Sequence, residues 1–126
     1  MMDAYRKGWA LRYLREAKAE LEAARKIPYM ASSLVLEAIR KARNAIYYSL
    51  GEPAFIEILI HDESAKVPSS NDSVLRFLIE IETIVQQISQ LEEVNGEAMM
   101  KQADSIVDIA TDIVETLTQE KFENFS

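Results

Sequence analysis

Glycine and proline are scarce in this chain of 126 residues, and all of them except Gly8 fall between or at the ends of long stretches with the periodicity of helices. Within each stretch, apolar residues recur every three or four positions, the spacing of a helix with one buried face. No hairpin dipeptide lies between alternating apolar and polar runs, so strands are not expected. The predicted helices cover about 3–26, 31–50, 53–61, 73–94 and 97–120. This pattern predicts an all-α fold, an up-and-down bundle of four long helices plus one short helix.

The length predicts a single domain over residues 1–126, large enough to bury a core without metal or disulfide, with a frayed tail over about 120–126. The helix over 31–50 is apolar around most of its circumference, so we expect it at the centre of the bundle. Ser32 or Ser33 is expected to cap its start. Gly51 is expected to take the left-handed position after its end.

Composition excludes several classes of site. No cysteine is present, so disulfides and thiolate catalysis are excluded. The single histidine, His61, excludes a site with two imidazoles inside one chain. No apolar run approaches the roughly 18 residues of a membrane span. No signal peptide is visible, and we therefore expect a cytoplasmic protein.

The net charge of −7 is unevenly distributed. Residues 1–51 contain ten Lys/Arg and five Asp/Glu, a balance of +5, whereas residues 52–126 contain four and sixteen, a balance of −12. The overall acidity argues against nucleic-acid binding over the whole surface but leaves a local basic patch open. We expect the two halves to face each other within the fold or across a dimer.

Two segments, YLREAKAELEAARK (13–26) and LVLEAIRKARNAIYYSLG (34–51), resemble the helical hairpin of the HEPN superfamily. The resemblance lies mainly in residues 5–53 and is closest to small archaeal and bacterial members, including those called nucleotidyltransferase substrate-binding-like. It implies a bundle of four or five helices that forms a homodimer. It also implies either a metal-independent ribonuclease with an Arg-polar-x-x-x-His motif or an inactive nucleotidyltransferase partner, as in a toxin–antitoxin pair.

Arg43 and Asn44 have the spacing of that motif, but Tyr48 stands where it requires histidine. A phenol with a pKa near 10 is a poor proton shuttle at neutral pH. Helical geometry places Arg43 in a mostly apolar sector, so we expect it to extend its guanidinium to solvent or to find a carboxylate, for which the second half supplies many candidates. His61 could complete a catalytic pair with Arg43 only from across a cleft. If this helix binds a ligand, the expected residues are Arg40, Lys41, Arg43 and Tyr48.

Two further groups are candidates. An acidic stripe on the last helix could bind Mg²⁺, as in all-α nucleotide pyrophosphatases, although a solvated face is the simpler interpretation. Its members are Asp104, Asp108, Asp112 and Glu115. Tyr5 and Trp9, beside Arg6 and Arg12, could stack a base, but core or dimer packing is expected.

The sequence thus favours a non-catalytic HEPN-like binding or regulatory module without a cofactor. We expect a homodimer that partners a nucleotidyltransferase or binds a nucleotide or RNA. The alternative is a hydrolase, either a ribonuclease using Arg43 with His61 or a Mg²⁺-dependent pyrophosphatase using the acidic stripe.

Overall fold

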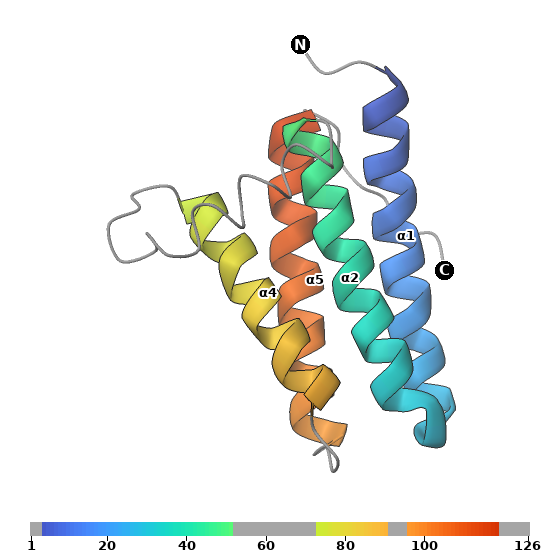
Figure 1. The fold of residues 1–126 in the computed structure, drawn as a ribbon. Coiled ribbons are helices and arrows are strands. Elements are labelled where there is room, and N and C mark those ends of the chain that lie inside the picture. Colours follow the sequence, from blue (N-terminus) through green and yellow to red (C-terminus); the bar gives the residue numbers. More distant parts are fainter. Residues whose placement is uncertain (1–3, 52–72, 91–95, 119–126) are drawn as a thin grey trace.

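The computed structural model describes residues 4–51, 73–90 and 96–118 of the chain (Figure 1). These residues form four α-helices, together with a short 3₁₀ turn at Pro28–Met30 and no strand. The helices are α1 (Ala4–Lys26), α2 (Ala31–Leu50), α4 (Ser73–Gln90) and α5 (Gly96–Thr118). The expected all-α class is confirmed. The short helix expected over 53–61 and the expected frayed tail lie outside the described residues.

Successive helices run in opposite directions, so the described part of the chain is an up-and-down bundle (Figure 1). None of the described helices combines the length and apolarity needed to cross a membrane.

Buried alanines are frequent on α1 and α2, the most extensive helix pair in the described part of the bundle. A methyl side chain lets two backbones approach closely, and alanine also favours the helix itself. Larger residues, including Leu14, Ile39 and Ile46, are fully buried beside them. The alanines, each 0–3 % exposed, are Ala10, Ala17 and Ala24 on α1 and Ala38, Ala42 and Ala45 on α2.

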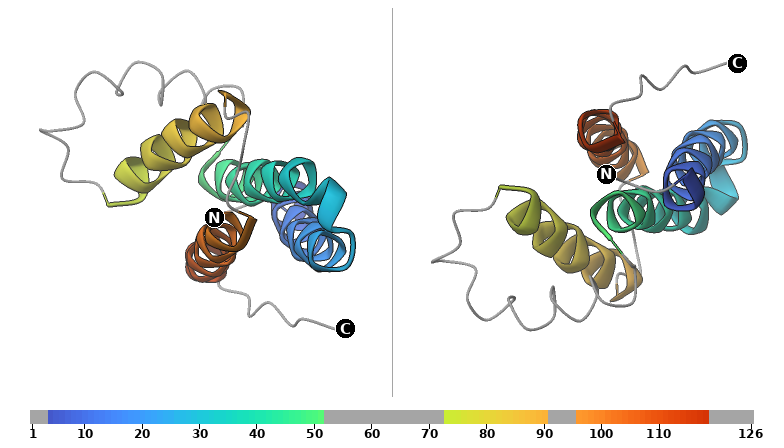
Figure 2. Two further views of the ribbon diagram at one scale, coloured as in Figure 1. Left: turned by 90° about the horizontal axis from the view of Figure 1, so that it is seen from below. Right: turned by 90° about the horizontal axis from the view of Figure 1, so that it is seen from above.

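The expected central position of α2 is also observed. Viewed along the bundle, α2 lies between α1, α4 and α5 (Figure 2). The helix α4 packs mainly against α2 and barely approaches α5, although the two helices are consecutive in the chain. In a regular four-helix bundle each helix packs against two neighbours, whereas α4 packs mainly against one. The described part of the bundle is therefore open between α4 and α5.

The ends of α2 differ from the expectation. Met30 occupies the N-cap position and makes no side-chain hydrogen bond there, while Ser32 and Ser33 lie exposed inside the helix. The preceding 3₁₀ turn explains this, because the Ala31 amide already donates to the Pro28 carbonyl. At the other end, Gly51 has an extended backbone (φ 170°, ψ −150°), so the predicted left-handed conformation is wrong.

We expect Ala45→Leu to lower the free energy of unfolding by about 1–3 kcal/mol, because added methylene groups force apart a tightly packed contact. Urea denaturation measures the change. Ala19→Leu, which adds the same atoms at an exposed position of α1, is the control and should stay within about 0.5 kcal/mol of the parent. Equal effects of both substitutions would contradict a tight contact at Ala45.

Candidate functional site

Arg43 connects α2 to α4 through an ion pair. Its Nη1 lies 2.9 Å from Oε1 of Glu82, and the Tyr47 hydroxyl donates to the same oxygen at 3.0 Å. The side chains of Arg43 and Glu82 are only 19 % and 23 % exposed. The guanidinium also lies over the Tyr47 ring, 5.6 Å from its centroid, and makes a long 3.5 Å contact with Asn44. Arg43 therefore finds a carboxylate of the second half of the chain, that of Glu82.

One atom of this cluster is incompletely satisfied. The Nε of Arg43 is buried, and no described group accepts a hydrogen bond from it. A buried donor without an acceptor costs about 1–3 kcal/mol, which reduces the net contribution of the ion pair. The guanidinium is therefore held through Nη1 on Glu82 and by the Tyr47 ring, and not through Nε.

Tyr48 lies on a different side of α2 from Arg43. Its ring stacks against Trp9 and Tyr13 of α1, with centroids 6.0 and 5.7 Å apart and planes 17° and 21° apart. Five residues along a helix rotate the chain by about 140°, which accounts for the separation of Arg43 and Tyr48. The residues of the ribonuclease-like spacing are thus not brought together, and His61 lies outside the described residues.

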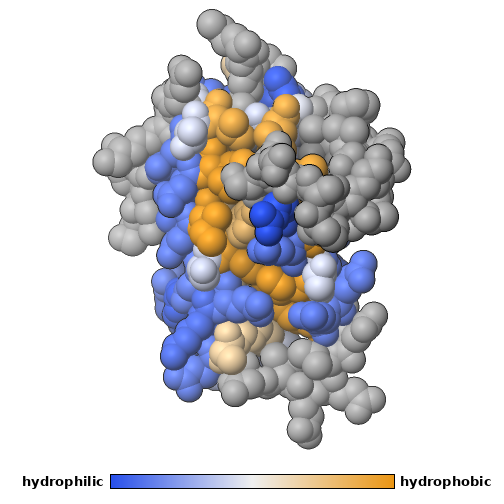
Figure 3. Space-filling model, turned by 90° about the vertical axis from the view of Figure 1, so that its left-hand side faces the viewer, coloured by the Kyte–Doolittle hydropathy of each residue, from blue (hydrophilic) through white to orange (hydrophobic). Residues whose placement is uncertain are grey.

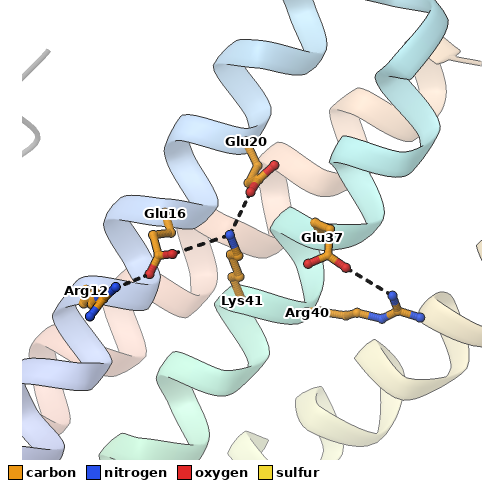
Figure 4. A network of polar contacts seen from close by, with 6 residues as sticks. All are labelled: Arg12, Glu16, Glu20, Glu37, Arg40 and Lys41. Carbon is orange, nitrogen blue, oxygen red and sulfur yellow. Dashed lines mark hydrogen bonds and ion pairs between the residues drawn. The ribbon is translucent and has the colours of Figure 1, made fainter.

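Lys41 joins α2 to α1 (Figure 4). Its ammonium group lies 2.7 Å from Glu20 and 3.5 Å from Glu16, and Glu16 in turn lies 3.3 Å from Arg12. The hydrogen bond to Glu20 raises the pKa of Lys41, and the nearby charges of Glu20 and Glu16 act in the same direction. This cation is engaged in holding two helices together.

Arg40 pairs with Glu37 on its own helix, at 3.3 Å (Figure 4). The four residues expected to bind a ligand therefore have separate partners in separate directions. They are Arg40 with Glu37, Lys41 with α1, Arg43 with α4, and Tyr48 with the aromatic rings of α1.

The carboxylates of the acidic stripe do not come together at one place. Asp104 pairs with Arg25 of α1, whose pKa is raised by that hydrogen bond. Asp108 and Asp112 are exposed, and Glu115 is half-buried. Among the described residues, no group of three or more histidine or acidic side chains could hold a metal ion. The inward orientation that would favour a metal enzyme is not observed for Asp108 or Asp112.

A groove of about 770 Å³ lies between α1 and α5. Its walls carry both signs of charge, and Arg25–Asp104 spans it. Apolar residues such as Leu21 and Val107 line the rest. Ion pairs between the basic and acidic halves include Arg25–Asp104 and Arg43–Glu82, whereas pairs such as Arg40–Glu37 and Lys41–Glu20 lie inside the basic half.

Sequence reasoning missed one cluster in this region. Tyr5 and Trp9 were expected to pack, but Tyr13 and Tyr48 also join them. The spacing of the aromatic residues at 5, 9 and 13, one turn apart each time, was the available signal.

No protein-family model, no curated protein and no solved structure matches the chain. The HEPN relationship therefore stays a prediction from the sequence.

The raised pKa of Lys41 gives a pH-dependent prediction. Its stabilising contribution is complete below the unfolded-state pKa of about 10.4 and is lost as the pH rises through the higher folded-state pKa. We expect the stability advantage of the parent over Lys41→Met, measured by urea denaturation, to shrink from pH about 9 to pH about 11.5. Lys101→Met, at an exposed lysine of α5, should follow the parent across this range. An advantage of the parent over Lys41→Met that does not change with pH would contradict the Lys41 contacts.

Proposed function

We propose that this chain is a non-catalytic, HEPN-like binding module that acts in the cytoplasm as a homodimer. The observation that carries the proposal is the engagement of Arg43 by Glu82 and Tyr47. A catalytic arginine must turn its guanidinium toward the substrate, and here doing so would leave a poorly solvated carboxylate without its partner. The HEPN resemblance supports a nucleotidyltransferase as the protein partner that the dimer regulates.

The chemistry around Arg43 supports the same proposal. General acid–base catalysis needs a group that titrates near neutral pH within hydrogen-bond reach of the substrate. The residue at the histidine position, Tyr48, stacks on rings of α1, and the other hydroxyl nearby, that of Tyr47, donates to Glu82. Neither hydrolase alternative is favoured by an observation on the described residues.

An apolar band on α5 supports the dimer. Ile109 and Leu117 are 42 % and 38 % exposed, and the half-buried Ile113 lies between them at the same helical spacing. Hydrophobic residues gather on this side of the molecule, where α4 and α5 meet only sparsely (Figure 3). Contiguous exposed apolar surface marks protein interfaces, and a second copy offers the same band in a two-fold arrangement.

We expect no cleavage of RNA. A mixed-sequence single-stranded RNA incubated with the protein should remain as intact as in a protein-free control, measured on denaturing gels. The expectation follows from the missing imidazole and the engaged Arg43. Cleavage that disappears in both Arg43→Ala and His61→Ala would overturn the non-catalytic proposal and establish the ribonuclease alternative.

We expect light scattering after size exclusion at micromolar concentration to give about twice the chain mass. Ile109→Glu should shift the protein to monomer, because a charge buried in an apolar interface is strongly unfavourable. Lys101→Glu places the same side chain on the polar side of α5 and should remain dimeric. A monomeric parent protein would contradict the proposed dimer. A dimeric Ile109→Glu variant would show that the dimer interface does not include the apolar band of α5.

A further inference from the structure

The N-terminal half of α1 combines aromatic and cationic side chains without acidic ones. Residues 4–15 contain four lysines and arginines, three aromatic residues and no carboxylate. The whole chain carries a net charge of −7, so this surface is a local exception. Trp9 of this surface stacks on Tyr48 of α2, Gly8 is exposed, and Arg15 lines the groove between α1 and α5.

We propose that this surface binds single-stranded nucleic acid by stacking bases on its rings. We call it the α1 platform and define it as Tyr5, Gly8, Trp9, Arg12 and Arg15. The inference rests on the proposed binding role and adds the ligand class and the surface.

The platform has a fixed inner layer and an open outer layer. The Trp9 ring lies nearly parallel to Tyr48 of α2, which fixes its orientation. Tyr5 meets Trp9 edge-on, with centroids 6.3 Å apart, and the Arg12 guanidinium lies 4.8 Å from the Trp9 centroid. Tyr5 is 67 % exposed. The Arg12 side chain is 59 % exposed, and its Nε lies 3.3 Å from Glu16. Aromatic rings and arginine planes held in this way are the groups on which unpaired bases stack.

Gly8 gives the platform a gap that the fold does not require. It lies inside α1, in the second turn, where glycine is unfavourable relative to alanine, and a Cβ there would meet nothing within 4 Å. On the helix surface its neighbours are Tyr5, three residues before, and Arg12, four residues after. The missing side chain therefore leaves bare backbone between two stacking groups, where a nucleotide can approach closely.

The charges favour nucleic acid over a second copy of the chain. A two-fold contact through this surface would bring its cations against the same cations of the other copy. Phosphates are complementary to Arg15 and, in competition with Glu16, to Arg12, and the positive end of the α1 dipole acts in the same direction. A single strand is required because the bases of a duplex are already stacked on one another.

Fluorescence offers a direct test, because Trp9 is the only tryptophan in the chain. The probe is a fluorescein-labelled, mixed-sequence RNA of about 12 nucleotides, followed by anisotropy and by Trp9 emission. We expect binding at low salt with quenching of Trp9. With three or four phosphate contacts, the affinity should fall about 20- to 50-fold between about 50 and 200 mM salt.

Two variants separate the platform from general stability. Tyr5→Ala should weaken binding about tenfold, the effect of losing one stacked base. Gly8→Gln fills the gap and should weaken binding to a similar degree while raising the thermal midpoint, because glutamine favours the helix over glycine. The controls are Tyr29→Ala, at a tyrosine that is 88 % exposed beyond the other end of α1, and Arg76→Ala, at an exposed arginine of α4. Both controls should bind as the parent does.

Several results would overturn the platform. These are no binding at low salt, equal binding of a duplex RNA of the same length, and unchanged affinity in both Tyr5→Ala and Gly8→Gln. Trp9 emission that changes with protein concentration in the absence of RNA would show that a second copy covers the surface. RNA binding by a monomeric protein would refute the proposed dimer, and RNA binding followed by cleavage would refute the proposed non-catalytic role. Neither result would contradict RNA binding at the α1 platform.

Discussion

The close packing of α1 against α2 is the constraint on which the rest of the structure depends. Buried alanines on both helices allow the backbones to approach, and this approach fixes the rotation of α2 about its axis. The side of α2 with Lys41 and Tyr48 then faces α1, and the side with Arg43 and Tyr47 faces α4. A cluster of cations that looks like one site in the sequence is thereby divided between two helix contacts.

The two N-terminal helices use their positive charge differently. On α2, Lys41 and Arg43 are largely buried and hold neighbouring helices through Glu20 and Glu82. On the first half of α1, Arg12 is mostly exposed, lies over an aromatic ring and makes a solvent-exposed pair with Glu16 of its own helix. A buried cation contributes to the fold, whereas an exposed cation beside aromatic rings remains accessible to an anionic ligand. The proposed division between a structural helix and a binding helix follows from this difference in exposure.

Much of the fold could be predicted from the sequence because helix geometry is local. The bounds of α2, its central position and the need of Arg43 for a carboxylate or solvent all follow from periodicity within one segment. The identity of that carboxylate does not, because it depends on how α4 crosses α2. The same holds for the stacking of Tyr13 on Tyr48 and for the sparse contact between α4 and α5. The extended conformation of Gly51 was also missed, since glycine permits many backbone conformations.

The structural role of Arg43 is tested most directly by a double-mutant cycle with Glu82. The free energies of unfolding of the parent, Arg43→Ala, Glu82→Ala and the double variant give the coupling between the two side chains. A mostly buried pair with a hydrogen bond between charged groups should show a coupling of about 1.5–3 kcal/mol. A coupling within about 0.5 kcal/mol of zero, as for a solvated surface pair, would show that Arg43 is not committed to the fold and is available for another role.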